Sequence, residues 1–223
     1  MERNELVLLR LSNQYLLRAG ERMEVLRAMN GFQAQFLSNA LHAMRLRSTA
    51  YDTAHAADSL VKSWTLRGTM HIFAEADLPL FLHTGCRYRS RDWTVPSFWN
   101  QRPNWALTPK RQAYFSDLII DALAQGPMTR EALKARCRAA GMTQAEEGSI
   151  FHPWGGGIRE LCERGFLCGT VSEEKAFRLC PAFTPMEEQD ALLEQTRRYF
   201  TNYGPASVRE RYHFGRRLVQ PDL

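Results

Sequence analysis

The sequence predicts a mainly helical protein with short β-hairpins, an α+β fold, organised as tandem modules. Apolar residues recur at three- and four-residue steps over most of the chain, whereas runs rich in β-branched and aromatic residues are short. A Gly-Pro-x-Thr/Ser turn also occurs twice, at residues 126–129 and 204–207, each time after an aromatic-bearing helix and before a basic one. A length of 223 residues allows one large domain or two to three small ones.

The composition is that of a protein with a hydrophobic core, since 44% of the residues are hydrophobic. Lys and Arg exceed Asp and Glu by 29 to 24, which is compatible with a polyanionic partner without requiring one. No run of about 18 apolar residues is present, so no membrane span is expected. The five cysteines form no CxxC pair and have no histidine at zinc-ligand spacing, which predicts reduced thiols and no metal site.

The N-terminal part predicts short helices at residues 5–18, 21–29 and about 33–47. Asn30 and Gly31 end the second, because both tolerate the left-handed conformation. Helices in this succession fit a helix-turn-helix unit, whose last helix commonly lies in a DNA major groove. Arg45 and Arg47 at its far end would suit phosphates, although arginines there also simply favour the helix dipole.

The next stretch predicts a helix at 51–62, a strand or hairpin arm at 63–73 and a helix at 74–82. Arg87, Arg89 and Arg91 then alternate with other residues, among them Tyr88. If this run is extended, one face is cationic and an aromatic ring lies near it, as in nucleic-acid grooves. Arginines on an ordinary exposed strand or helix face would show the same spacing without any role in binding. Prolines and tryptophans at 94–109 predict a connector.

A second module follows, with helices predicted at 110–125, 130–139 and from Ile158, the middle one capped by Thr129. Short strands at 166–168 and 176–180 complete the winged-helix order of helices followed by a hairpin. A third copy begins with helices at 187–201 and 208–217, and is incomplete. The predicted modules are therefore residues 1–108, 109–184 and 185–223.

Gln33 and Gln35 are the candidate catalytic residues. Residues two apart do not share a face inside a helix, but at a bent helix entry both amides can meet one ligand. Solvated glutamines at a helix start would have the same spacing.

Several of these features together resemble the winged-helix DNA-binding family that includes the AlkZ-like, or YcaQ-like, DNA glycosylases. Gln33-Ala34-Gln35 is similar to the family's Gln-x-Gln or Gln-x-Asp catalytic motif. The stretch Trp64 to His71 is similar to its RGT-x-H segment, and the tandem modules share its Gly-Pro-x-Ser/Thr turns.

The resemblance implies tandem winged helices around double-stranded DNA, and hydrolysis of the N-glycosidic bond of alkylated or crosslinked nucleotides without a metal or cofactor. It also implies a cytoplasmic location, at a bacterial nucleoid. The short third module puts full encirclement of DNA in doubt.

An alkylated purine already carries positive charge, so the reaction needs a positioned water more than a strong acid. A glutamine carbonyl can accept a hydrogen bond from that water but cannot take a full charge, so positioning and electrostatics would dominate. His71 would contact a phosphate or the leaving base, or is a half-buried structural histidine. The predicted DNA contacts are Arg45, Arg47, Arg67, His71, Arg87, Arg89 and Arg91.

The alternative functions are a non-catalytic winged-helix DNA-binding protein, either a regulator or an interaction module, and a scaffold for protein partners. Formation of abasic sites separates the glycosylase from the non-catalytic DNA-binding protein. Absence of DNA binding at low salt would identify the scaffold for protein partners.

Overall fold

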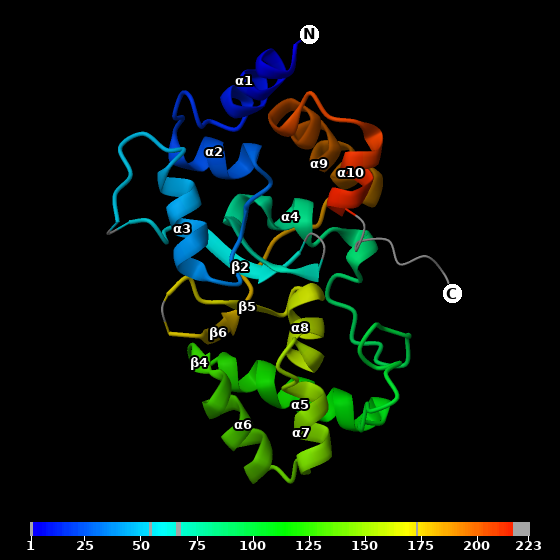
Figure 1. Cartoon of the computed structure of the whole chain (residues 1–223). Coiled ribbons are helices and arrows are strands. Elements are labelled where there is room, and N and C mark those ends of the chain that lie inside the picture. The colour runs from blue at the N-terminus through cyan, green and yellow to red at the C-terminus, as the bar shows by residue number, and fades with distance from the viewer. Residues whose placement is uncertain (1, 54, 66–67, 173, 216–223) are drawn as a thin grey trace. The chain divides into compact units, whose positions relative to one another are not determined.

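The computed structural model describes residues 2–53, 55–65, 68–172 and 174–215 (Figure 1). The chain forms two compact units. Unit 1 combines Met1–Gly85 with Phe183–Leu223, and unit 2 is Cys86–Ala182. Within the described parts, no helix is both long and apolar enough to cross a bilayer.

The helices of unit 1 are α1 (Arg3–Asn13), α2 (Arg22–Ala28), α3 (Leu37–Arg45), α4 (Leu78–Phe81), α9 (Glu188–Tyr203) and α10 (Val208–Gly215), with 3-10 turns η2 (Glu75–Asp77) and η3 (Thr84–Cys86). Local capping explains where several begin. Before α2, the Glu21 carboxylate accepts hydrogen bonds from the backbone N–H groups of Met23 and Glu24, both at 2.8 Å. Before α10, Ser207 and Glu210 form a reciprocal capping box.

Strands β1 (Phe32–Gln33), β3 (Met70–Ala74) and β2 (Leu60–Trp64) lie side by side in unit 1, and each neighbouring pair is antiparallel. The register places Gln33 opposite His71, and His71 opposite Ser63. Directly opposite residues in antiparallel strands project to the same face. A polar row therefore crosses the sheet, while Ile72 and Phe73 are buried.

Helix α9 contacts α1, α2 and α4, although it begins more than a hundred residues after them (Figure 1). A buried ion cluster fixes it. Arg198 donates to both carboxylate oxygens of Asp77, at 2.8 and 3.0 Å, and to Glu194 at 2.7 Å. The guanidinium also donates to the Arg27 carbonyl at 3.0 Å, so all three of its nitrogens are hydrogen-bonded.

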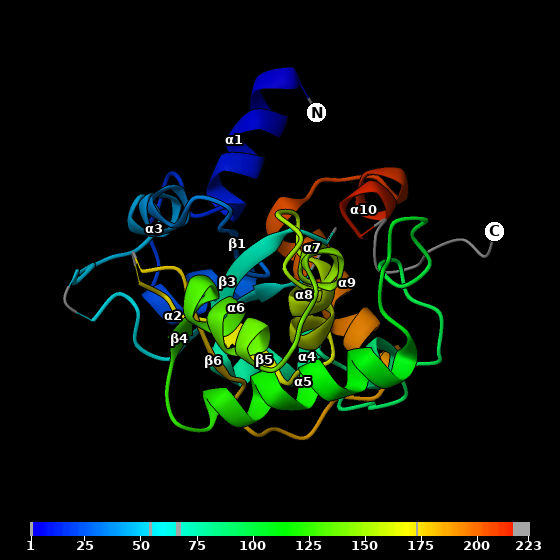
Figure 2. The ribbon, with the colours of Figure 1, turned by 90° about the horizontal axis from the view of Figure 1, so that it is seen from below.

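Unit 2 contains α5 (Pro109–Leu123), β4 (Met128–Thr129), α6 (Arg130–Ala139), α7 (Gln144–Ile150), α8 (Gly156–Glu163), β5 (Leu167–Gly169) and β6 (Ala176–Leu179). Strands β5 and β4 each pair antiparallel with β6. Helix α5 contacts α6 and α8 (Figure 2). The core includes Phe115, Leu133, Ile158 and Leu167, all fully buried. Thr129 accepts from the Ala132 backbone N–H at 3.2 Å, so the predicted cap of this helix is confirmed.

The prediction of helices combined with short hairpins is confirmed. The predicted helix at 51–62 is wrong. Ala50 and Ser59 take positive φ values of 46° and 57°, and β2 begins at Leu60, where pairing with β3 outweighs local helix preference. Between the predicted helices at 130–139 and from Ile158 lies a further helix, α7, which a capping box between Thr143 and Glu146 starts.

The condition that the run from Arg87 to Arg91 is extended is not met, since Arg87 and Arg89 both have φ of 56° and no described residue there belongs to a strand. Helices α9 and α10 belong to unit 1 rather than to a compact unit of their own, and residues 86–108 belong to unit 2. The division into three winged-helix modules at residues 108 and 184 stays a prediction.

Candidate active site

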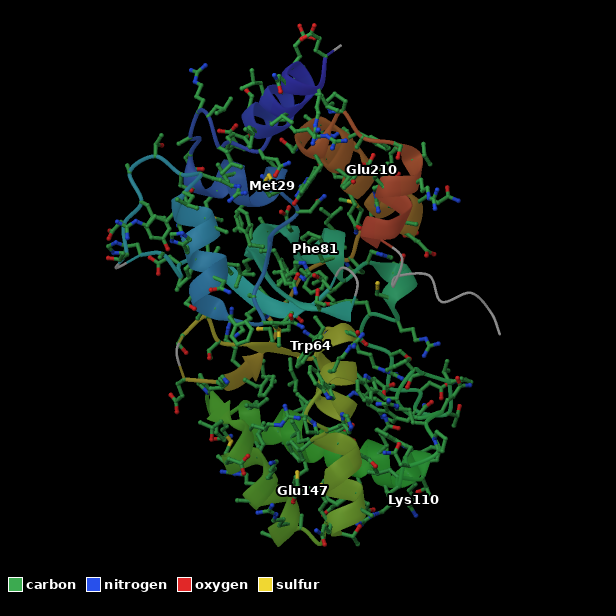
Figure 3. The ribbon with its side chains drawn as sticks, viewed as in Figure 1. Met29, Trp64, Phe81, Lys110, Glu147 and Glu210 are labelled. Atoms are coloured by element: carbon green, nitrogen blue, oxygen red, sulfur yellow. The ribbon has the colours of Figure 1, made fainter. Side chains whose placement is uncertain are left out.

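A tight turn between α2 and β1 leads the chain into the glutamine pair. Asn30 and Gly31 both have positive φ, 56° and 78°. A Cβ at Gly31 would lie 2.5 Å from the Ile72 carbonyl oxygen, so only glycine allows this close approach of the turn to β3. Met29, labelled in Figure 3, precedes the turn, and its carbonyl accepts a hydrogen bond from the Tyr203 hydroxyl at 3.1 Å.

The glutamines lie just ahead of α3 rather than in its first turn. Gln33 ends β1, opposite His71, and the backbone N–H of Ala34 donates to the Met70 carbonyl at 2.7 Å. Because Ala34 is buried and its neighbours on either side are exposed, Gln33 and Gln35 both project outward from one bend.

The two amides meet directly. Gln33 Nε2 donates to Gln35 Oε1 over 2.8 Å. This bond orients the Gln35 carboxamide, whose Nε2 then points away from Gln33 as a donor. The pair presents neutral hydrogen-bonding groups at one exposed corner, where it can orient a small polar molecule but cannot carry away a full charge.

His71 lies opposite Gln33 in the sheet and is buried. Its side chain is 3% exposed, and Nδ1 lies 3.0 Å from the Thr69 carbonyl oxygen. A carbonyl only accepts, so Nδ1 carries a proton and donates it to this bond. The imidazole is therefore bonded to a residue just before its own strand, β3, which pairs with β1 at Gln33. Its role as a DNA contact stays a prediction.

The two arginines at and just after the end of α3, Arg45 and Arg47, differ from one another. Arg45 is exposed in the last turn. Arg47 folds back instead, donating to the Ala43 carbonyl at 2.9 Å and lying 5.6 Å from the centre of the Phe32 ring. Burial lowers the Arg47 pKa from its ordinary value. Arg67 lies outside the described residues.

The other predicted arginines belong to unit 2. Arg89 and Arg91 lie over the Phe166 ring, at 5.3 and 5.2 Å from its centre, and Arg91 also pairs with Asp117. Arg87 is exposed. These contacts hold the two stacked guanidinium groups by cation–π attraction.

A sequence signal that the motif analysis missed surrounds the glutamines. No Asp or Glu occurs from Val25 to Tyr51, a stretch that includes Arg45 and Arg47. The surface around the pair therefore lacks carboxylates of its own chain segment, which removes local repulsion toward a polyanion. Among the described residues, no group of three His, Cys, Asp or Glu side chains is placed to hold a metal ion.

Comparison with known proteins gives matches over this same region and beyond it. The chain is 29% identical over 202 residues to an interstrand DNA cross-link repair glycosylase of Streptomyces sahachiroi, covering 83% of this chain and 52% of that protein. It thus spans about half the length of this curated relative. The solved structure of Streptomyces sahachiroi DNA glycosylase AlkZ superposes with a TM-score of 0.75 at 23% identity, covering 99% of this chain and 62% of that one. The sequence profile described as DNA glycosylase AlkZ-like matches residues 26–218, and the chain therefore belongs to the AlkZ-like DNA glycosylase family.

Proposed function

We propose that this protein hydrolyses the N-glycosidic bond of alkylated or crosslinked nucleotides in double-stranded DNA, with Gln33 and Gln35 positioning the attacking water. The observation that carries the proposal is the 2.8 Å hydrogen bond between the two amides at an exposed bend. Family membership supplies the reaction class. The chain covers about half of its curated relative, so the substrate and activity of the complete relative are extended to it here as a proposal.

The chemistry suits neutral side chains. A purine alkylated at N7 or N3 is already cationic and departs without protonation by a strong acid. The sugar then develops positive charge and needs a water on its free face. Glutamine oxygens accept hydrogen bonds from that water, and the pairing of the amides keeps both in one orientation, so that the geometry is set before the substrate binds.

Binding to DNA rests on charge and fold. The chain has a formal net charge of +5, and its glutamine pair lies in a stretch without acidic residues. We assign the phosphate contacts to Arg45 in unit 1 and to Arg87, Arg89 and Arg91 in unit 2, with Arg47, Arg67 and His71 as further predicted contacts. Tandem winged-helix modules would present these residues.

The test is single-turnover excision from a duplex oligonucleotide with one N7-methylguanine, followed by alkaline cleavage of abasic sites. Gln33→Ala and Gln35→Ala should each slow excision on the order of 100-fold, since each removes a positioned hydrogen-bonding group. Gln189→Ala is the matched control, because Gln189 is an exposed glutamine of the same unit, on α9. It should retain the wild-type rate.

Full activity in both glutamine variants would remove the pair from the mechanism. Absence of abasic sites with the unaltered protein would refute the glycosylase. If DNA binding that weakens with salt remained in that case, the protein would be a non-catalytic DNA-binding member of the family.

A further inference from the structure

A large aromatic side chain stands exposed beside the glutamine pair. Phe36 directly follows Gln35 and is 72% exposed. It occupies the residue before α3 with φ of −112° and ψ of 110°, an extended conformation that ends the bend. The phenylalanines of the neighbouring strands β1 and β3, Phe32 and Phe73, are 8% and 1% exposed.

The local backbone explains why Phe36 is not buried. Ala34 and Ala40 occupy the inward positions on either side of the bend and are 0% and 1% exposed. These two alanines take the inward positions, and Phe36, which lies between them in the chain, is on the outer side. Ser38 and Asn39, which follow in the first turn of α3, are exposed and polar. Phe36 is therefore an isolated aromatic group on a polar surface that has no nearby carboxylate along the chain.

A lone exposed aromatic residue is common on protein surfaces. The distinguishing feature of Phe36 is that it directly follows Gln35 in the chain. Consecutive Cα atoms lie about 3.8 Å apart, and successive nucleotides of one strand rise by about 3.4 Å along the duplex axis. A ring one residue beyond Gln35 is thus on the scale of one nucleotide step from a sugar held by the amides.

We propose that Phe36 inserts into the base stack beside the lesion and fills the gap that opens when the damaged nucleotide is displaced toward Gln33 and Gln35. This inference rests on the proposed function. Enzymes that act on a base inside a duplex must unstack it, and apolar side chains inserted between base steps stabilise such openings. A phenylalanine also stacks on any base without regard to sequence.

The inserted Phe36 ring, called the wedge below, can act only in a duplex, where it keeps a neighbouring base pair from closing the gap. Phe36→Ala should therefore slow single-turnover excision of N7-methylguanine from duplex DNA about 10- to 100-fold, in line with the loss of one stacked base. The rate on the same strand without its complement should change less than about 2-fold by the same reasoning. Phe36→Trp should restore the duplex rate, and Phe36→Leu should give an intermediate rate.

Leu46→Ala is the matched control. Leu46 follows the last residue of α3 and is 55% exposed. The substitution therefore removes a comparable apolar group at the opposite end of the same helix. It should leave both rates unchanged. Circular dichroism melting of each variant shows whether the fold is retained.

A binding readout separates this inference from the proposed function. A 2-aminopurine placed next to the lesion should brighten when the unaltered protein binds the duplex, and should not brighten with Phe36→Ala. Suppose that the fluorescence rises with the unaltered protein and not with Phe36→Ala, while no excision occurs. This result would refute the glycosylase and retain the wedge. Equal slowing on duplex and single-stranded DNA, or unchanged brightening in Phe36→Ala, would overturn the wedge and leave Phe36 as a structural or protein-contact residue.

Discussion

The side-chain amide of Asn30 donates to the backbone carbonyl of Gln195 over 3.2 Å, joining residues 165 positions apart. Gln195 in turn donates from Nε2 to the Leu80 carbonyl at 2.8 Å. Together with the bond from Tyr203 to Met29, these contacts hold the turn before the glutamine pair against α9. The geometry of the candidate site therefore depends on a helix near the other end of the chain.

Tyr203→Phe tests this dependence. The variant loses the hydroxyl that holds the turn and keeps the ring, which stacks on Tyr199 at 5.1 Å. It should lower the free energy of unfolding by about 1 kcal/mol, the typical net value of one hydrogen bond, and should lower the excision rate at saturating DNA. Urea unfolding and single-turnover kinetics measure the two effects. Tyr114→Phe, at a 48% exposed tyrosine, should match the unaltered protein, and an equal effect of both substitutions would contradict the prediction.

Gly31→Ala should be strongly destabilising. The new Cβ would meet the Ile72 carbonyl oxygen at 2.5 Å, at a residue with φ of 78°. The left-handed conformation alone costs a non-glycine residue about 1–2 kcal/mol, and the clash adds to it. Thermal unfolding measures the loss. Gly148→Ala provides the opposite control, because no described neighbouring atom lies within 4 Å of its added Cβ in α7. It should stabilise by about 0.5–1 kcal/mol, and a destabilisation as large as that of Gly31→Ala would speak against this account.

Asp77→Asn should destabilise unit 1. Asp77 is 3% exposed and receives both terminal nitrogens of Arg198, which is 7% exposed. Removing one charge of a buried pair leaves the other uncompensated and typically costs about 3–5 kcal/mol. Chemical denaturation followed by far-UV circular dichroism measures this. Arg197→Ala breaks only an exposed pair with Glu194 and should leave the unfolding midpoint nearly unchanged. A similar shift of the unfolding midpoint in both variants would show that burial of the ion pair does not determine its contribution to stability.

Acid should weaken unit 2 through Glu146. The hydrogen bonds from Arg111, at 2.6 and 2.8 Å, hold the pKa of this carboxyl at about 2, below its ordinary value of 4.5. Because the folded pKa is the lower one, the stabilisation is complete above about pH 4.5 and is lost as the pH falls toward 2.

Glu146→Gln should therefore unfold at lower urea than the unaltered protein at pH 6, and the difference should shrink as the pH approaches 2. Trp93, Trp99, Trp105 and Trp154 lie in unit 2, so tryptophan fluorescence reports this transition. Glu131→Gln, at an exposed carboxylate of α6, should keep the wild-type pH profile. A constant difference between Glu146→Gln and the unaltered protein from pH 6 to 2 would exclude titration of Glu146 as the cause.

The cysteines should differ sharply in reactivity. Cys86 is half-exposed, whereas the other four thiols are buried, at Cys137, Cys162, Cys168 and Cys180. Burial raises the pKa of Cys137 to about 12, so its reactive thiolate is scarce near neutral pH. Brief treatment with iodoacetamide followed by peptide mass spectrometry should find Cys86 modified in the native protein and all five residues modified after unfolding. Native modification at Cys137 would contradict the packing of α6.

Sequence reasoning located most helices because their signals are local. Thr129 marks the start of α6 because it is the N-cap of that helix, and the apolar spacing of α5 repeats within a few residues. The same reasoning misplaced residues 51–62, where alanines suggest a helix, because the pairing of Leu60 with Ala74 is decided by a strand that comes later in the chain. Thr143 and Glu146 had the spacing of a capping box, a local signal for α7 that was overlooked.

For the candidate site, spacing and motif resemblance alone were enough to single out Gln33 and Gln35 and to point to the family. Tertiary structure was needed to show that Gln33 belongs to a strand, that its amide bonds to Gln35, that His71, opposite Gln33, is buried and that Phe36 is exposed. The reason is physical. Helix periodicity and caps act over about four residues, whereas the contacts that hold this bend come from β3 and α9, and no local pattern encodes partners so far along the chain.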